Sequence, residues 1–212
     1  MTVTFISYAD GNIHKKNQLK QQTSLLGFGV FDKIKLLKKE DIDLSFLTKH
    51  KTTLSHPKGA GLWLWKPYLI CKELQSMSEG SVLFYCDSDW VFNKSPKRFI
   101  DMTSDNQIVL FHERGAIASN WTAANTFKAM DADSKKFKNT TMLLAGYSVW
   151  KSGCASKAFA KEWLKWCCIP EAMGCGNESR HCYDQSVLTI LAKQNGIVPE
   201  LSPRMDKTIV QQ

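Results

Sequence analysis

The sequence predicts one α/β domain over residues 1–212, with a mostly parallel central sheet flanked by helices, and three observations support this fold class. A short strand expected at 3–8, a polar stretch at 14–26 and a second strand expected at 30–37 have the order of two parallel strands joined by a crossover helix. The run 81–86 is continuously apolar, as expected for a strand covered on both faces. No internal repeat and no linker divides the chain, whose 212 residues suit one large core.

The remaining elements follow from the spacing of apolar residues and from turn residues. Strands are expected over 107–112 and 141–150. Helices are expected over 63–75, 155–167 and 184–193. The proline at position 67 falls in the first turn of the first of these helices, where its missing N–H is tolerated.

The composition is that of a globular protein with an excess of positive charge. Lys and Arg number 28 and Asp and Glu 20, which gives a formal net charge of +8, and hydrophobic residues make up 43% of the chain. These values exclude a disordered polyampholyte. No stretch approaches the roughly 20 apolar residues of a membrane span, so none is expected. Seven cysteines occur without an export signal, and we therefore expect reduced thiols in a cytoplasmic compartment.

Two carboxylates, those of Asp87 and Asp89, directly follow the apolar run 81–86. Side chains two apart on an extended chain point the same way, so both face one site at the carboxyl end of a strand, where open α/β sheets bind ligands. The two carboxylates repel each other and favour a divalent cation, and their hard oxygens suit Mn²⁺ or Mg²⁺. An ordinary turn is the alternative, but acids among apolar residues are costly without a counter-ion.

The chain resembles the metal-dependent, nucleotide-sugar glycosyltransferases of the GT-A fold, a Rossmann-like domain. The run that ends in Asp87-Ser88-Asp89 is similar to the DxD motif that follows a hydrophobic strand in that family. Four further segments resemble parts of the family's site. Segment 4–10 is similar to the first strand and the nucleotide-binding loop, and 59–67 to the start of the helix that carries a basic residue. Segment 144–150 is similar to the strand that lines the sugar site, and 180–188 to the Asp-Gln segment of retaining, glycogenin-like members. Within the family, the chain resembles the glycosyltransferase module of a large algal (chlorella-type) virus.

The resemblance implies transfer of a hexose or deoxyhexose from a UDP-sugar to a hydroxyl of a glycan or glycoprotein acceptor, with retention at the anomeric carbon and Mn²⁺ or Mg²⁺ as cofactor. It places at the donor nucleotide and its metal the residues Ser7, Tyr8, Asp10, Lys66, Asp87, Ser88 and Asp89. Asp87 and Asp89 would hold the metal, and Asp184 and Gln185 would act catalytically at the donor sugar. A mobile loop should exclude water, and segment 113–140 is the candidate. A viral member of this family would act in the cytoplasm of its host.

The third metal ligand is left open by a departure from the glycogenin-like pattern. Those members have a late His followed by a Lys, whereas segment 201–212 contains no His. Arg204 and Lys207 are the candidates for the phosphate contact, and the short end also fits one module of a longer polypeptide. Lys66 could equally be a solvated lysine, and Asp184 could be the N-cap of the helix that follows it.

Two other classes of protein are the alternatives. The net charge of +8 and the seven Trp fit a nucleic-acid-binding protein, but the lysines are scattered and no helix-turn-helix, zinc-finger or RNP-like pattern occurs, so no nucleic acid partner is expected. A glycoside hydrolase also uses two carboxylates, but they lie about 5 Å or more apart on opposite sides of a bond. The side chains of Asp87 and Asp89 point to the same side of the chain, so they could not stand on opposite sides of a glycosidic bond.

Overall fold

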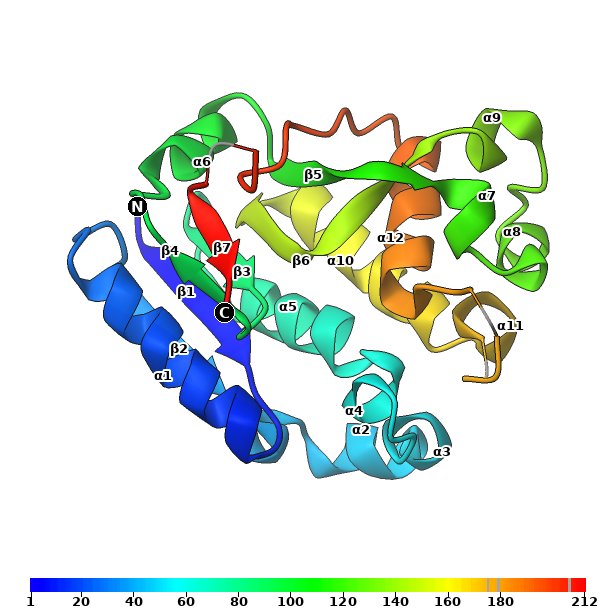
Figure 1. Ribbon diagram of the computed structural model, residues 1–212, viewed down its shortest axis with the longest axis horizontal. Coiled ribbons are helices and arrows are strands. Elements are labelled where there is room, and N and C mark those ends of the chain that lie inside the picture. Colours follow the sequence, from blue (N-terminus) through cyan, green and yellow to red (C-terminus); the bar gives the residue numbers. More distant parts are fainter. Residues whose placement is uncertain (175, 179, 206) are drawn as a thin grey trace.

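The computed structural model describes residues 1–174, 176–178, 180–205 and 207–212, and at positions 113 and 114 it describes the backbone alone (Figure 1). Its central sheet has five strands in the order β2-β1-β3-β6-β5. The bounds are β1 Val3–Tyr8, β2 Lys33–Leu37, β3 Val82–Cys86, β5 Ile108–Ile117 and β6 Thr141–Lys151. β1 is parallel to β2 and to β3, while β6 is antiparallel to both β3 and β5. Four of the five strands therefore run in one direction, which confirms the predicted mostly parallel sheet.

Helices cover both faces of this sheet. The long helices are α1 Asn12–Leu26, α5 Trp65–Ser76, α10 Cys154–Cys167 and α12 Tyr183–Gln194. The short ones are α2 Leu44–Lys49, α3 Lys51–Leu54, α4 Gly59–Leu62, α6 Lys97–Asp101, α7 Ala118–Trp121, α8 Ala124–Ala129, α9 Lys135–Lys138 and α11 Pro170–Met173, with 3-10 turns η1 Lys39–Asp41 and η2 Met102–Ser104. A second sheet pairs β4 Trp90–Phe92 with β7 Ile209–Gln211. No described helix is long and apolar enough to cross a membrane.

The pleat of the strands divides the core into two layers. Ile6, Tyr8, Leu83 and Tyr85 pack with the buried faces of α5, α10 and α12. The residues between them along the strands pack with α1, α6 and the small β4–β7 sheet; these are Val3, Phe5, Val82, Phe84 and Cys86. Every residue of β1 and β3 is buried, so the apolar run that ends at Cys86 and the mainly apolar segment 3–8 reflect strands covered on both faces.

The predicted helix over 63–75 begins two residues later, because the chain before it forms a left-handed turn. Residues 59–63 have φ angles of 61°, 49°, 106°, 53° and 59°. The turn is closed by two hydrogen bonds, from Leu62 N to Lys58 O at 2.8 Å and from Trp63 N to Gly59 O at 3.2 Å. A left-handed conformation is unfavourable for residues with a Cβ atom, and such conformations are held only where the surroundings impose them. The turn leads directly into α5, which carries Lys66.

Replacing Gly61 with alanine should destabilise the protein by roughly 3 kcal/mol. Its φ is +106°, and an added Cβ would lie 2.7 Å from the Cα of Leu54, a backbone atom that cannot rotate away. The matched control is Gly80→Ala, at φ +78° with no heavy atom within 4 Å of the added Cβ, and it should cost about 1 kcal/mol. Urea unfolding measures the free energy of unfolding of both variants. If the two variants lose equal amounts, the contact between the added Cβ and Leu54 does not cause the destabilisation.

Candidate functional site

The Asp87-Ser88-Asp89 segment begins directly after β3, at the carboxyl end of the strand, as predicted. The backbone N–H of Asp87 donates to the carbonyl of Gly146 in β6 at 2.7 Å, and the side-chain amide of Gln21 in α1 donates to the carbonyl of Asp87 at 2.7 Å. A Cβ on Gly146 would lie 3.2 Å from Asp87 Oδ2. The sheet and α1 thus hold the segment from two sides, and the glycine leaves room for the carboxylate.

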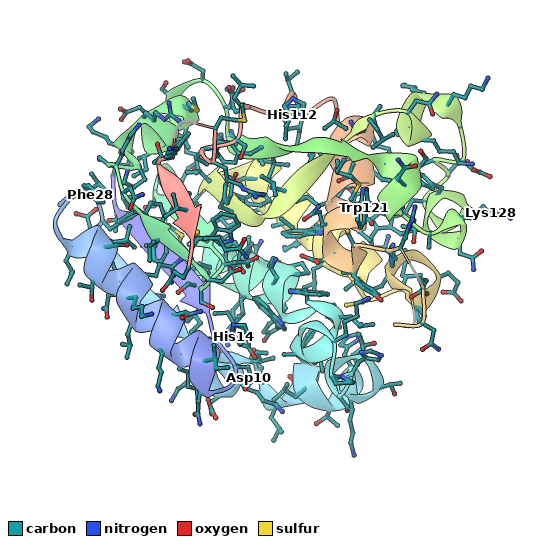
Figure 2. All side chains as sticks on the ribbon, viewed as in Figure 1. Asp10, His14, Phe28, His112, Trp121 and Lys128 are labelled. Atoms are coloured by element: carbon teal, nitrogen blue, oxygen red, sulfur yellow. The ribbon has the colours of Figure 1, made fainter. Side chains whose placement is uncertain are left out.

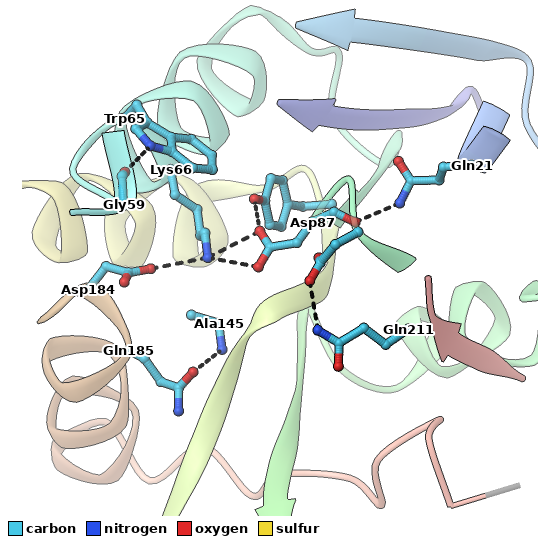
Figure 3. Close-up of polar contacts among 11 residues, drawn as sticks. Gln21, Gly59, Trp65, Lys66, Asp87, Ala145, Asp184, Gln185 and Gln211 are labelled. Carbon is cyan, nitrogen blue, oxygen red and sulfur yellow. Dashed lines mark hydrogen bonds and ion pairs between the residues drawn. The ribbon is translucent and has the colours of Figure 1, made fainter. Parts of the chain in front are cut away.

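A buried ammonium group joins two carboxylates beside this segment (Figure 3). Lys66 Nζ lies 3.2 Å from Asp87 Oδ1 and 3.4 Å from Asp184 Oδ2. Lys66 and Asp184 are each 3% exposed. The hydroxyl of Tyr85 donates a further hydrogen bond to Asp87 Oδ1. Lys66 is therefore not a solvated lysine, and it connects α5 to both β3 and α12.

Burial and charge act in opposite directions on these three groups. Burial alone lowers the pKa of Lys66, but the carboxylates of Asp184 and Asp87 outweigh it, so that the pKa lies above its ordinary value and the ammonium is retained. Burial raises the pKa of Asp184 to about 6, against the opposing effect of Lys66. Burial also raises the pKa of Asp87. The cluster is thus short of positive charge, with one ammonium for two carboxylates.

A cavity of about 1270 Å³ opens beside Asp87-Ser88-Asp89. One wall is formed by this segment together with the end of β1 and the start of α1, where Asp10 and His14 lie (Figure 2). The opposite wall consists of residues between 39 and 63; they are Lys39, Ile42, Leu47, Thr48, Lys51, Leu54, Ser55, His56, Pro57, Gly59, Ala60 and Trp63. Every residue of α2 and α3 in this wall is exposed or half-buried, in contrast to the fully buried β3.

Five of the predicted donor-site residues line this cavity: Tyr8, Asp10, Asp87, Ser88 and Asp89. The ring of Tyr8 is 5% exposed and is stacked on Trp65, with ring centroids 4.0 Å apart and an angle of 24°. A base that stacked on Tyr8 would therefore have to use the ring face opposite Trp65. Lys66 lies behind Asp87, outside the cavity lining.

Besides Lys66, three predicted site residues do not line the cavity: Ser7, Asp184 and Gln185. Ser7 is fully buried, and its Oγ has no hydrogen-bond partner among the described residues. It shares the face of β1 with Phe5, opposite to that of Tyr8, because consecutive strand residues point to opposite faces. Asp184 contacts the cavity segment through Lys66, and the side-chain oxygen of Gln185 accepts a hydrogen bond from Ala145 N in β6 at 3.4 Å.

Sequence reasoning also missed the residues that complete the cavity. The described lining residues fall within 8–14, 39–65 and 87–89, so the segment predicted as a closing loop, 113–140, does not contribute to this wall. Instead it carries the helices α7, α8 and α9. The basic residues of the lining are His14, Lys39, Lys51 and His56. These four residues form no motif in the sequence, and nothing local distinguishes them from the other scattered basic residues.

The donor set fits a divalent cation that shares its shell with a ligand. Asp87 and Asp89 offer carboxylate oxygens toward the cavity, which are the ligands that Mg²⁺ and Mn²⁺ prefer. Among the described residues, no group of three or more His, Cys, Asp or Glu could form a closed metal site. A Mg²⁺-type ion is commonly held by one or two carboxylates, with water and substrate phosphates in the other positions.

No protein-family model and no curated protein matches the sequence, but many solved structures resemble the fold, including three glycosyltransferases. Mouse xyloside xylosyltransferase 1 in its apo form is 12% identical, with a TM-score of 0.53 over 95% of this chain and 84% of that one. A glycosyltransferase involved in glycosylation of the major capsid of PBCV-1 is 11% identical, with a TM-score of 0.50 over 95% and 82%. The bifunctional glycosyltransferase WbbM is 11% identical, with a TM-score of 0.53 over 90% and 37%. The chain has the GT-A-like fold of these glycosyltransferases.

Proposed function

We propose that this chain is a single-domain, metal-dependent glycosyltransferase that moves a hexose or deoxyhexose from a UDP-sugar to a glycan hydroxyl. The observation that carries the proposal is the position of Asp87 and Asp89. Both open into a cavity of about 1270 Å³ at the carboxyl end of β3, in a fold shared with three glycosyltransferases. Ligand sites of open α/β sheets lie at this edge. Retention at the anomeric carbon rests on the Asp184-Gln185 segment alone.

In this proposal the chain's own residues bind and orient the donor. Asp89, with Asp87, would hold Mn²⁺ or Mg²⁺, and the bound cation would supply Lewis-acid stabilisation of the leaving diphosphate. Asp10, Tyr8 and Ser88 line the part of the cavity assigned to the nucleoside. The basic residues of the opposite wall, which include Lys39 and Lys51, give that side a positive potential for phosphate.

The proposed sugar end of the site lies toward α12. Asp184 acts there through Lys66: its carboxylate keeps the ammonium charged, and the ammonium fixes the carboxylate of Asp87 at 3.2 Å. Asp184 is in this sense a positioning residue. Gln185, hydrogen-bonded to the β6 strand at Ala145, is held beside it.

The contacts of Lys66 with Asp87 and Asp184 argue against a glycoside hydrolase that uses these two residues as its acid and base. Glycosidases keep space for a glycosidic bond between two carboxyl groups. Here the ammonium of Lys66 occupies the space between them, within 3.4 Å of each.

Binding of UDP in the presence and absence of Mn²⁺ tests the proposed function. A ligand at 100 times its Kd stabilises the folded state by about 2.7 kcal/mol, and each kcal/mol raises the Tm of a chain of this size by roughly 2–4 °C. We expect that shift for UDP with Mn²⁺ and a much smaller one for UDP with EDTA. ADP and GDP with Mn²⁺ serve as controls for the base. Equal shifts with and without metal, or none at all, would contradict the proposal.

A further inference from the structure

The side chain of Gln211 lies directly against the second carboxylate of the cavity segment. Its Nε2 is 3.1 Å from Asp89 Oδ2 (Figure 3). β7 places it there: Gln211 pairs with Trp90 in the antiparallel β4–β7 register, and the next residue, Gln212, donates from its backbone N to Asp89 O at 2.8 Å. The side chain of Gln212 also donates to the carbonyls of Ser88 and Asn17. Backbone pairing therefore fixes the amide of Gln211 at this carboxylate.

The spacing of these two groups suits a shared cation. In an octahedral shell with metal–oxygen bonds of about 2.1 Å, neighbouring oxygens lie about 3 Å apart. The amide of Gln211 is 3.1 Å from Asp89 Oδ2, and half a turn about its last side-chain torsion exchanges the positions of its nitrogen and oxygen. A glutamine amide is both a donor and an acceptor, so it can donate to the bare carboxylate and present its oxygen to a cation.

The other groups at the site leave a position for this oxygen. Asp87 and Asp89 line the cavity, but Lys66 contacts both carboxylate oxygens of Asp87 and Tyr85 donates to one of them, so Asp87 can offer a cation only the lone pairs that these contacts leave free. Among the described residues, no third carboxylate, thiolate or imidazole completes a cluster with Asp87 and Asp89. Amide oxygens are ordinary ligands of hard divalent cations. We propose that the side-chain oxygen of Gln211 is a third protein ligand of the divalent cation held by Asp87 and Asp89. This inference rests on the proposed function.

The test measures binding of Mn²⁺ itself, from the loss of the free-ion EPR signal, with and without UDP. Gln211→Ala should weaken Mn²⁺ binding about tenfold. The matched control is Gln75→Ala, another exposed glutamine with one side-chain hydrogen bond to a carbonyl, that of Lys157 in α10, and it should bind Mn²⁺ as the wild type does. Gln211 is exposed, so circular dichroism and Tm should show an intact fold. An unchanged Mn²⁺ affinity in Gln211→Ala would overturn the inference.

Gln211→Glu tests whether the side chain at position 211 reaches the cation. A glutamate there adds a carboxylate oxygen beside Asp89 and should bind Mn²⁺ more tightly than the wild type, because crowded carboxylates favour a divalent cation. A Mn²⁺ affinity no higher than that of the wild type would overturn the inference. Gln211→His should bring ¹⁴N coupling to the Mn²⁺ signal in pulsed EPR, since imidazole nitrogen is a metal ligand, and absence of that coupling would also count against it.

Failure of the inference can be told from failure of the proposed function. If the wild type does not bind Mn²⁺ with UDP, both the proposed function and the proposed role of Gln211 are wrong. If Asp89→Ala loses Mn²⁺ while Gln211→Ala and Gln211→Glu keep wild-type affinity, the proposed metal site stands and the role of Gln211 alone is wrong.

Discussion

Replacing Asp89 with alanine should abolish Mn²⁺-dependent binding of UDP, with an affinity loss of at least about 100-fold, while leaving the fold intact. A ligand lost from a site with few protein donors cannot be replaced by its neighbours, and effects of 10- to 100-fold follow even from changes outside the first ligands. The fold should survive because Asp89 is half-buried at the cavity wall and its carboxylate interacts with the exposed side chain of Gln211. Isothermal titration of UDP at saturating Mn²⁺ measures the loss, and circular dichroism checks the fold.

The control for Asp89→Ala is Asp101→Ala. Asp101 is an exposed carboxylate with a single lysine partner, Lys97, on α6, so its removal should leave UDP binding unchanged. If Asp89→Ala turns over a UDP-sugar at the wild-type rate, the assignment of the metal and diphosphate to this end of β3 is wrong, whatever the activity proves to be.

Replacing Lys66 with methionine should destabilise the fold by about 3–5 kcal/mol, the range found when one partner of a buried ion pair is removed. The change leaves the carboxylates of Asp87 and Asp184 facing each other without a cation, and Asp184 is 3% exposed. Urea unfolding at pH 8 measures the loss. The double variant Lys66→Met/Asp184→Asn should recover part of it, because one of the two uncompensated charges is gone.

The loss in Lys66→Met should be smaller at pH 5 than at pH 8. Burial raises the pKa of Asp184 to about 6 even with Lys66 present, and an acid whose folded-state pKa is raised destabilises the fold increasingly as the pH rises from its unfolded value through its folded one. Below that window the carboxyl is protonated and needs no cation. Lys72→Met on the same helix removes an exposed pair with Asp43 and should change stability little at either pH. A Lys66→Met loss no larger than that of Lys72→Met would contradict the buried-cluster argument.

The sequence was most informative where burial alone decides the local structure. The strands at 3–8 and 81–86 were predictable because both faces are buried and nearly every residue is apolar. The left-handed turn at 59–63 was not, since three of its five residues are not glycine and propensity argues against their φ angles. The short β7 strand was not predicted either, because its partner β4 lies more than 100 residues earlier and no local pattern records such a pairing.

The candidate site was also predictable only where it depends on the end of a buried strand. Asp87 and Asp89 follow a strand whose end could be located, so their position at the sheet edge followed directly. Ser7 and Tyr8 were both assigned to the nucleoside, although adjacent strand residues point to opposite faces, and the structure brings only Tyr8 to the cavity. The distance of Asp184 from the cavity depends on how α12 packs against β6 and α10, which is a tertiary contact.

The unequal burial of the two cavity walls determines where the cavity could be altered. The wall at the carboxyl end of β3 belongs to the sheet core, where a change in volume disturbs the packing of the whole domain. Thr48 and Lys51 in the wall from α2 and α3 are exposed, whereas Leu47 and Leu54 pack against the core, and substitutions away from buried contacts are usually tolerated. Substitutions meant to reshape the cavity therefore belong at its exposed positions, such as Thr48, Lys51 and Ser55, with Asp87 and Asp89 kept constant.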